Sequence, residues 1–206
     1  MSLRLIVIRH GETDWTREGR YAGSRDVPLN PLGLRQGDAT AAALAGRFLS
    51  AVYASPLERA RTSAEIIAKP HRLEVAVEAA FREMTFGAWE GLTRDEVAAV
   101  FPGLYRTWWE TPHLAPLPGG EALAEVGARV AEGLGELRAQ HADETVVLVT
   151  HGVVIRLLVL EALGLGPERL WSLEASPAGI TELEYEADWA TIHCMNTLVH
   201  LDGMTP

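Results

Sequence analysis

The chain has 206 residues, of which 48 % are hydrophobic, and it carries a formal net charge of −10. This length and apolar content fit one globular domain and exclude an intrinsically disordered chain. The acidic charge argues against nucleic acid as a partner, because a phosphate backbone binds to a basic face. A local cluster of arginines can still oppose the overall sign, so a small phosphorylated metabolite stays compatible with the composition.

The start of the chain shows no signal peptide, and no apolar run is long enough to span a bilayer. We therefore expect a soluble cytoplasmic protein with no membrane partner. The lone cysteine, Cys194, excludes an internal disulfide, and its strand-like surroundings predict a buried small side chain. The sequence leaves the oligomeric state open, with a homodimer as one option.

Strands and helices are predicted to alternate along most of the chain. Apolar runs and periodic stretches give, in order, strand 3–8, helix 30–48, strand 49–55, helix 56–69, strand 73–77, helix 121–140, strand 145–150, helix 152–164, and strands 180–187 and 189–196. Asn30 and Pro31 are a plausible cap and first turn for the first of these helices. The alternation predicts an α/β fold, a three-layer sandwich with a mostly parallel sheet and helices on both faces.

The pattern weakens at about residues 86–120, which are rich in tryptophan, proline and glycine. We expect this segment to be a small helical and loop insertion that acts as a cap within a single domain of residues 1–206. Two interpretations of Trp89, Trp108 and Trp109 stay open. They contact an apolar part of the substrate, or they only pack the cap.

Charged and polar side chains follow three of the predicted strands. The first strand runs into Arg9 and His10, the second is followed by Arg59, and the strand at 145–150 by His151. Ligands bind beyond the carboxyl ends of the strands in parallel sheets. If these strands are neighbours, two histidines and an arginine meet at one edge of the sheet.

This combination suits phosphoryl transfer. The planar fork of an arginine matches phosphate oxygens, and a neutral histidine nitrogen can take the phosphoryl group covalently. Nearby arginines favour the neutral ring, and a second, protonated histidine could donate to a phosphate oxygen. Exposed amides at the helix that starts at Gly152 would also favour an anion, and Gly11 would let a ligand approach the backbone.

A leaving alkoxide needs a proton, so a general acid should be present. The candidate is Glu83 in "FREMTFGAWEGL", where we expect partial burial beside the aromatic segment. The alternative is Glu12, which lies within the first motif. The remaining histidines show no spacing typical of metal ligands, so no metal site is predicted.

Five stretches, in this order, resemble the signature blocks of the histidine phosphatase superfamily, in its phosphoglycerate mutase-like branch: "LIVIRHGETDW", "YAGSRDVPLNPLG", "YASPLERARTSAEII", "REMTFGAWEG" and "VLVTHGVVIRLL". The resemblance implies that His10 is the phosphorylated nucleophile and Glu83 the proton donor. It implies a phosphate pocket formed by Arg9, Arg59 and His151, and no metal or organic cofactor. Gly23 matches a small residue that approaches the phosphate through its backbone.

Two positions depart from related sequences. Thr16 stands where the family usually has an asparagine that touches the phosphate, so the hydroxyl or a water would take that place. Met84 stands where family mutases carry an arginine that holds a second anionic group. With few basic residues and several aromatic ones between Glu83 and Gly120, an apolar cap is expected.

The leading hypothesis is a phosphomonoesterase, a histidine phosphatase that hydrolyses a small phosphorylated metabolite through a phosphohistidine. One alternative is phosphoryl transfer of the cofactor-dependent phosphoglycerate mutase type, and another is a non-catalytic phosphate-binding regulator. The substrate stays open between sugar phosphates, phosphoglycerates, nucleotides and ribazole phosphate.

Overall fold

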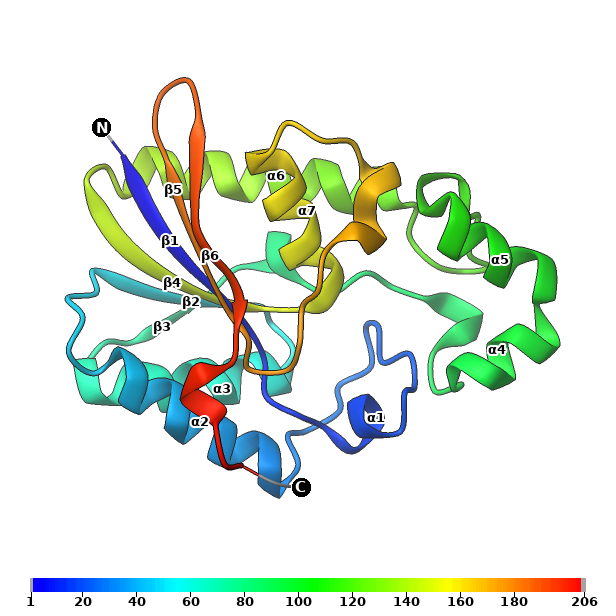
Figure 1. Ribbon diagram of the computed structural model, residues 1–206, viewed down its shortest axis with the longest axis horizontal. Helices are drawn as coiled ribbons and strands as arrows, with labels where there is room; N and C mark the ends of the chain where they lie inside the picture. Colours follow the sequence, from blue (N-terminus) through cyan, green and yellow to red (C-terminus); the bar gives the residue numbers. More distant parts are fainter. Residues whose placement is uncertain (1, 205–206) are drawn as a thin grey trace.

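A computed structural model describes residues 2–204; residues 1 and 205–206, the ends of the predicted domain, lie outside the described part. Within it, one sheet is built from six strands: β1 (Leu3–Arg9), β2 (Ala51–Ala54), β3 (Val75–Val77), β4 (Glu144–Thr150), β5 (Ile180–Tyr185) and β6 (Ala190–Thr197). The strand order is β3-β2-β4-β1-β5-β6 (Figure 1). The pairs among β1, β2, β3 and β4 are parallel, and β5 and β6 add an antiparallel edge.

Helices cover both faces of this sheet. Helices α2 (Pro31–Leu44) and α3 (Glu58–Ala68) lie on one face, and α6 (Leu123–Gln140) and α7 (Gly152–Ala162) lie on the other (Figure 1). Alternate residues of β1 therefore enter two separate cores: Leu5 and Val7 pack with α6 and α7, and Ile6 and Ile8 pack with α2 and α3. The predicted three-layer sandwich is confirmed.

The first long helix begins as the sequence indicates. The Asn30 side chain accepts a hydrogen bond from the Gly33 amide at 2.8 Å, and Pro31 occupies the first helical position. The helix ends at Leu44, earlier than predicted, and Phe48 is exposed. Cys194 lies on the edge strand β6 and is only half-buried, which corrects the expectation of a buried thiol.

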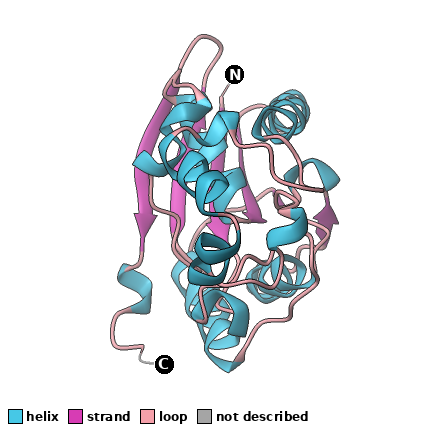
Figure 2. Ribbon diagram, turned by 90° about the vertical axis from the view of Figure 1, so that its right-hand side faces the viewer, coloured by secondary structure: helices cyan, strands magenta, loops and turns pink. Residues whose placement is uncertain are grey.

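The 86–120 segment contains two short helices that the hydrophobic pattern did not predict, α4 (Arg94–Val100) and α5 (Pro102–Glu110). They lie at one end of the molecule, beyond the sheet (Figure 1), and Figure 2 views them from that end. A capping box between Thr93 and Glu96 starts α4, and Pro102 occupies the first turn of α5. These helices are therefore indicated by their capping residues and not by a periodic pattern of hydrophobic residues.

The strand order brings three carboxyl ends together. Because β4 lies between β1 and β2, the ends of these strands are neighbours. The ladder continues one residue further on both sides, with hydrogen bonds from the His10 amide to the Thr150 carbonyl and from the Ser55 amide to the Val149 carbonyl, both 3.0 Å. In the described part of the chain, no helix has the length and apolar character needed to cross a membrane.

Candidate active site

His10 lies at the end of β1 and is 3 % exposed. Its Nδ1 lies 2.7 Å from the Gly11 carbonyl oxygen, which can only accept, so Nδ1 carries the proton and Nε2 the lone pair. The Nε–H of Arg59 donates to this Nε2 at 3.2 Å. Burial, with Arg59 and Arg9 adding to it, lowers the pKa of His10 well below its ordinary value. A neutral ring suits a nucleophile, and its Nε2 lone pair becomes available when a phosphoryl group takes over the hydrogen bond from Arg59.

Arg59 is fixed on the first turn of α3 and is almost fully buried. Its two terminal nitrogens donate to the carbonyl oxygens of Arg25 at 2.7 Å and Gly23 at 2.8 Å. Gly23 adopts a φ of +52°, which favours glycine. The loop after the first motif therefore holds Arg59 against His10, and Gly23 borders the same pocket.

Three polar atoms at the pocket are buried without a hydrogen-bond partner among the described residues. Nε of Arg9 and the hydroxyl of Tyr21 belong to residues that line the cavity, and Nδ1 of His151 belongs to a ring that lies 5.1 Å from the His10 ring without lining the cavity itself. The other nitrogens of these side chains are held, since Arg9 Nη1 donates to the Ala175 carbonyl at 2.6 Å and His151 Nε2 lies 2.6 Å from Ser55 Oγ. Buried polar groups are normally paired, so Arg9 Nε and His151 Nδ1, on either side of His10, mark a place for a polar ligand.

Burial affects the charge of these two residues differently. It lowers the pKa of Arg9 to about 10, so this guanidinium stays charged near neutral pH. Burial, followed by the charge of Arg59, lowers the pKa of His151 well below its ordinary value. This direction favours a neutral His151 ring, in contrast to the protonated ring expected from the sequence. A neutral ring can still donate one N–H to a phosphate oxygen.

Glu83 lines the same cavity as His10 and is 9 % exposed, as the sequence suggested. Its Oε1 accepts a hydrogen bond from the Met84 amide at 2.9 Å, which holds the carboxylate in place. Glu12 instead accepts from Asn30 Nδ2 at 2.9 Å and is not among the residues that line the cavity. The geometry favours Glu83 as the acid.

Arg129 on α6 supports the Glu83 segment, and it was not among the residues predicted from the sequence. Its Nη1 donates to the carbonyl oxygens of Ala80 at 2.7 Å and Arg82 at 2.6 Å. The side chain also pairs with Glu121 at 3.1 Å. An arginine on the polar face of an amphipathic helix gives no sequence signal for such a role.

Close packing requires glycine at Gly11 and leaves little room for a side chain at Gly152. An ideal Cβ on Gly152, the first residue of α7, would lie 3.1 Å from Arg156 Nη1 and 3.7 Å from Arg9 Cζ. A Cβ on Gly11 would lie 2.5 Å from the Gly33 carbonyl oxygen. Gly11 is thus needed for contact with α2, which differs from the expected approach of a ligand.

Thr16 lines the cavity, but its hydroxyl is engaged locally. Oγ1 accepts from the Thr13 amide at 2.8 Å and donates to the Thr13 carbonyl at 2.9 Å, forming the cap of the short helix α1 (Asp14–Arg17). The substitution of the family asparagine therefore places a helix-capping group at this wall of the pocket.

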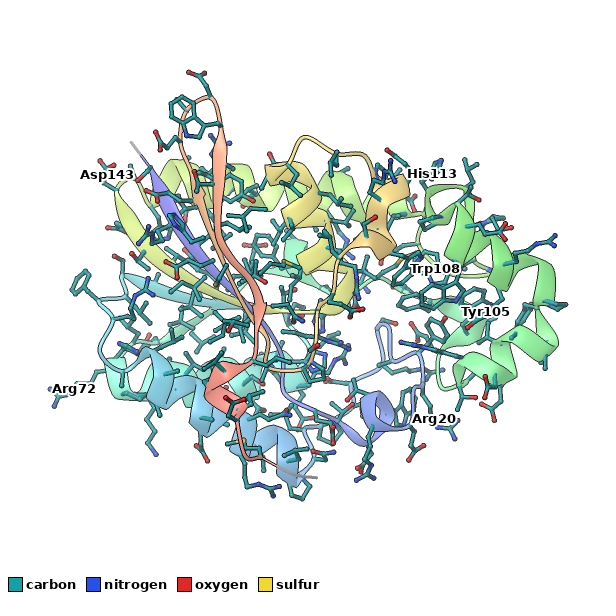
Figure 3. The ribbon with its side chains drawn as sticks, viewed as in Figure 1. Arg20, Arg72, Tyr105, Trp108, His113 and Asp143 are labelled. Carbon is teal, nitrogen blue, oxygen red and sulfur yellow. The ribbon has the colours of Figure 1, made fainter. Side chains whose placement is uncertain are left out.

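The tryptophans of the 86–120 segment lie behind the pocket. Trp89 and Trp108 are fully buried and do not line it, so the packing interpretation holds for these two. Trp109 does not line it either and packs against Trp171, with ring centroids 4.4 Å apart. Figure 3 shows Trp108 and Tyr105 on the inner side of α4 and α5.

The cavity, of about 330 Å³, is more basic than expected. Its wall also contains seven residues that were not predicted to lie there: Arg20, Phe86, Arg94, Arg156, Trp171, Glu174 and Ser176. The 86–120 segment contributes Phe86 and Arg94 to this wall, and the other basic residues come from elsewhere in the chain. Arg156 had a signal, because it is the only charged residue in the apolar stretch 152–160.

The described residues include no group of three histidine, cysteine, aspartate or glutamate side chains that could hold a metal ion. The site thus consists of two neutral histidines, several arginines and one buried carboxylate at the carboxyl ends of β1, β2 and β4. This arrangement can bind a phosphate dianion, accept a phosphoryl group on nitrogen and protonate a leaving oxygen.

Comparisons with known proteins agree with this chemistry. The family model of branch 1 of the histidine phosphatase superfamily matches residues 5–198. Phosphoserine phosphatase 1 of Hydrogenobacter thermophilus is 35 % identical over 199 residues, which cover 97 % of this chain and 94 % of that protein.

Two solved structures also resemble this chain over almost its whole length. The Bacillus stearothermophilus protein YhfR superimposes with a TM-score of 0.91 at 30 % identity, covering 97 % of this chain and 100 % of that one. A histidine-to-alanine variant of the phosphoserine phosphatase from Entamoeba histolytica, in complex with phosphoserine, gives 0.87 at 30 % identity, covering 97 % and 99 %.

The chain belongs to branch 1 of the histidine phosphatase superfamily, with the phosphoglycerate mutase-like fold. It is a phosphatase of small phosphorylated metabolites, as the homologues named phosphoserine phosphatase indicate.

Proposed function

We propose that this phosphatase hydrolyses phosphate monoesters through a phosphohistidine on His10. The observation that carries the proposal is the tautomer of His10. Its proton is held on Nδ1 by the Gly11 carbonyl, and the lone pair of Nε2 lies beside the Arg59 guanidinium. An incoming phosphorus atom would meet a nucleophilic nitrogen and a cation together.

The reaction follows in two steps. In the first, the Nε2 lone pair of His10 forms a bond to phosphorus while the ester P–O bond breaks, and the Glu83 carboxyl gives its proton to the leaving oxygen. In the second, Glu83 takes a proton from water, the water oxygen attacks phosphorus, and the P–N bond breaks to release phosphate and neutral His10. The burial of Glu83 beside His10 supports the acid and base role.

Three residues would stabilise the charge on the three non-bridging oxygens. Arg9 and Arg59 contribute permanent cations, and the unpartnered Arg9 Nε and a His151 N–H contribute directed donors. Preorganised donors of this kind are each worth roughly 10²–10³ in rate when removed. The 86–120 segment would act as the cap over this site within a single domain.

A mutase must hold a second anionic group and protect the phosphohistidine from water. Met84, at the position of the mutase arginine, is fully buried and does not line the cavity, so it contributes no such contact. The basic wall at Arg94 and Arg156 keeps the mutase alternative open to test, whereas the names of the relatives favour hydrolysis.

The test of hydrolysis against transfer uses 3-phosphoglycerate with catalytic 2,3-bisphosphoglycerate, following free phosphate and the 2-isomer together. We expect phosphate release without significant isomerisation. Rapid appearance of the 2-isomer with background phosphate release would replace the phosphatase by a mutase. Turnover of p-nitrophenyl phosphate separates either enzyme from a non-catalytic binding protein, which would give none.

A further inference from the structure

Three arginines line the cavity outside the group that would hold the phosphate, and one of them, Arg20, is paired with Glu18 and Glu96. Arg94 is the first residue of α4, and Arg156 lies one turn into α7. Arg156 Nε donates to the Leu173 carbonyl at 2.9 Å and Nη1 to the Gly152 carbonyl at 3.0 Å, which leaves Nη2 available. Arg94 forms no hydrogen bond or ion pair with another described residue.

A stack of tryptophans supports both guanidinium groups. Arg94 Cζ lies 5.6 Å from the ring centroid of Trp109, and Arg156 Cζ lies 5.1 Å from that of Trp171. The two rings pack on each other at 4.4 Å, and Trp171 Nε1 donates to the Trp108 carbonyl at 2.7 Å. Packing on an indole face restrains a guanidinium and leaves its N–H edge free to bind a ligand.

The charges of this wall do not balance internally. Burial lowers the pKa of Arg156, the charges of Glu83 and Glu174 raise it, and the nearby charge of Arg94 lowers it. Glu83 belongs to the catalytic group as the proposed acid, so Glu174 is the carboxylate that remains to offset the charge of Arg94 and Arg156. With Glu83 assigned in this way, two arginines against one glutamate leave room for a monoanion, whereas a second phosphate dianion would overcompensate. Since the planar fork of arginine matches a carboxylate, a carboxylate is the monoanion that fits.

The second anion must lie close to the phosphate. A Cβ on Gly152 would be 3.1 Å from Arg156 Nη1 and 3.7 Å from Arg9 Cζ, so the two guanidinium groups border the same small space. A ligand bound to both would have its carboxylate only a few bonds from the ester oxygen.

We propose that Arg94 and Arg156 form a carboxylate subsite, and that the substrate is a short phosphate monoester with a carboxylate a few bonds from the ester oxygen. This inference rests on the proposed hydrolysis at His10. It makes Arg94 and Arg156 determinants of specificity, and it assigns Trp109 and Trp171 a positioning role.

The experiment compares two pairs of esters that differ mainly in the carboxylate: O-phosphoserine with O-phosphoethanolamine, and 3-phosphoglycerate with glycerol 3-phosphate. The measured quantity is the ratio of kcat/KM within each pair. We expect the carboxylate to be preferred by roughly ten- to a hundredfold, the usual effect of a charge-assisted hydrogen bond on binding. Arg94→Gln should reduce both ratios by about tenfold, and so should Arg156→Gln.

Arg106→Gln is the matched control, because Arg106 is an exposed arginine on the neighbouring helix α5 that does not line the cavity. Its ratios should equal those of the parent. Ratios within about threefold of one in the parent, or unchanged in both Arg94→Gln and Arg156→Gln, would overturn the subsite. Failure to turn over any ester, including p-nitrophenyl phosphate, would instead overturn the proposed hydrolysis.

Discussion

Replacement of Glu83 by glutamine removes the proposed general acid and preserves its shape. Glu83 Oε1 accepts from the Met84 amide at 2.9 Å, and a glutamine oxygen can accept the same bond. The second carboxylate oxygen lies 3.5 Å from the Val153 amide, too far for a strong hydrogen bond that the variant would lose. We therefore expect Glu83→Gln to fold with nearly the stability of the parent.

The loss of activity should depend on the leaving group. For an alkyl ester, general acid catalysis is worth about 10²–10⁴ in rate, or roughly 2.7–5.4 kcal/mol in the barrier. For p-nitrophenyl phosphate, whose leaving group needs little protonation, the first step should be almost unaffected. The assay measures kcat for O-phosphoserine and pre-steady-state release of p-nitrophenol.

A matched control is Glu12→Gln, a carboxylate of the first motif that does not line the cavity and whose Oε1 accepts from Asn30. It should retain the parent's rates with both substrates. Equal losses in Glu83→Gln for the alkyl and the aryl ester would refute the acid role, because a general acid acts only where the leaving oxygen needs a proton.

The other predictions concern the nucleophile, the charge state of the pocket and the loop that holds it. His10→Ala should abolish turnover while circular dichroism shows a folded protein; activity within about tenfold of the parent would exclude His10 as nucleophile. In urea unfolding, buried neutral His10 should make the free energy of unfolding fall as pH drops below 6.5, since the unfolded ring takes up a proton there. His10 should contribute about 1.4 kcal/mol per pH unit to this slope, and His10→Ala should lack that contribution. Identical slopes of unfolding free energy against pH in the parent and the variant would contradict the lowered pKa. Glu90 accepts hydrogen bonds from the Ser24 amide at 2.9 Å, Ser24 Oγ at 3.0 Å and the Phe86 amide at 3.1 Å. Glu90→Ala should therefore lower the free energy of unfolding by about 3 kcal/mol or more and lower kcat/KM. A variant as stable as the parent would show that the loop does not depend on Glu90.

The sequence predicted the body of the fold because its signals are local. The apolar run of β1 and the Asn30 cap of α2 both act within a few residues, and the structure has both. The end of helix α2 was missed because tertiary contacts decide where a weakly periodic stretch ends. The short helices α4 and α5 were missed because their signal is local capping and not hydrophobic periodicity. The order of the strands also had to be assumed before the histidines could be placed together.

The pocket was predictable where a residue directly follows a strand. His10 and His151 do so, and the structure brings their rings to 5.1 Å between centroids. The proposed carboxylate subsite was not predictable, because Arg94 and Trp171 come from separate segments that only the folded chain brings together. The neutral state of His151 was missed for a related reason, since the depth of burial is a property of the whole fold.

The central claim is that the phosphoryl group passes through His10, and trapping that intermediate tests it most directly. The enzyme is mixed with ³²P-labelled substrate, quenched in alkali within the first turnover, and digested for peptide mapping. The account predicts a label that survives alkali, is lost in acid, maps to the peptide containing His10 and is absent from His10→Ala. An active enzyme that gives no label, or a label on a different residue, would contradict it.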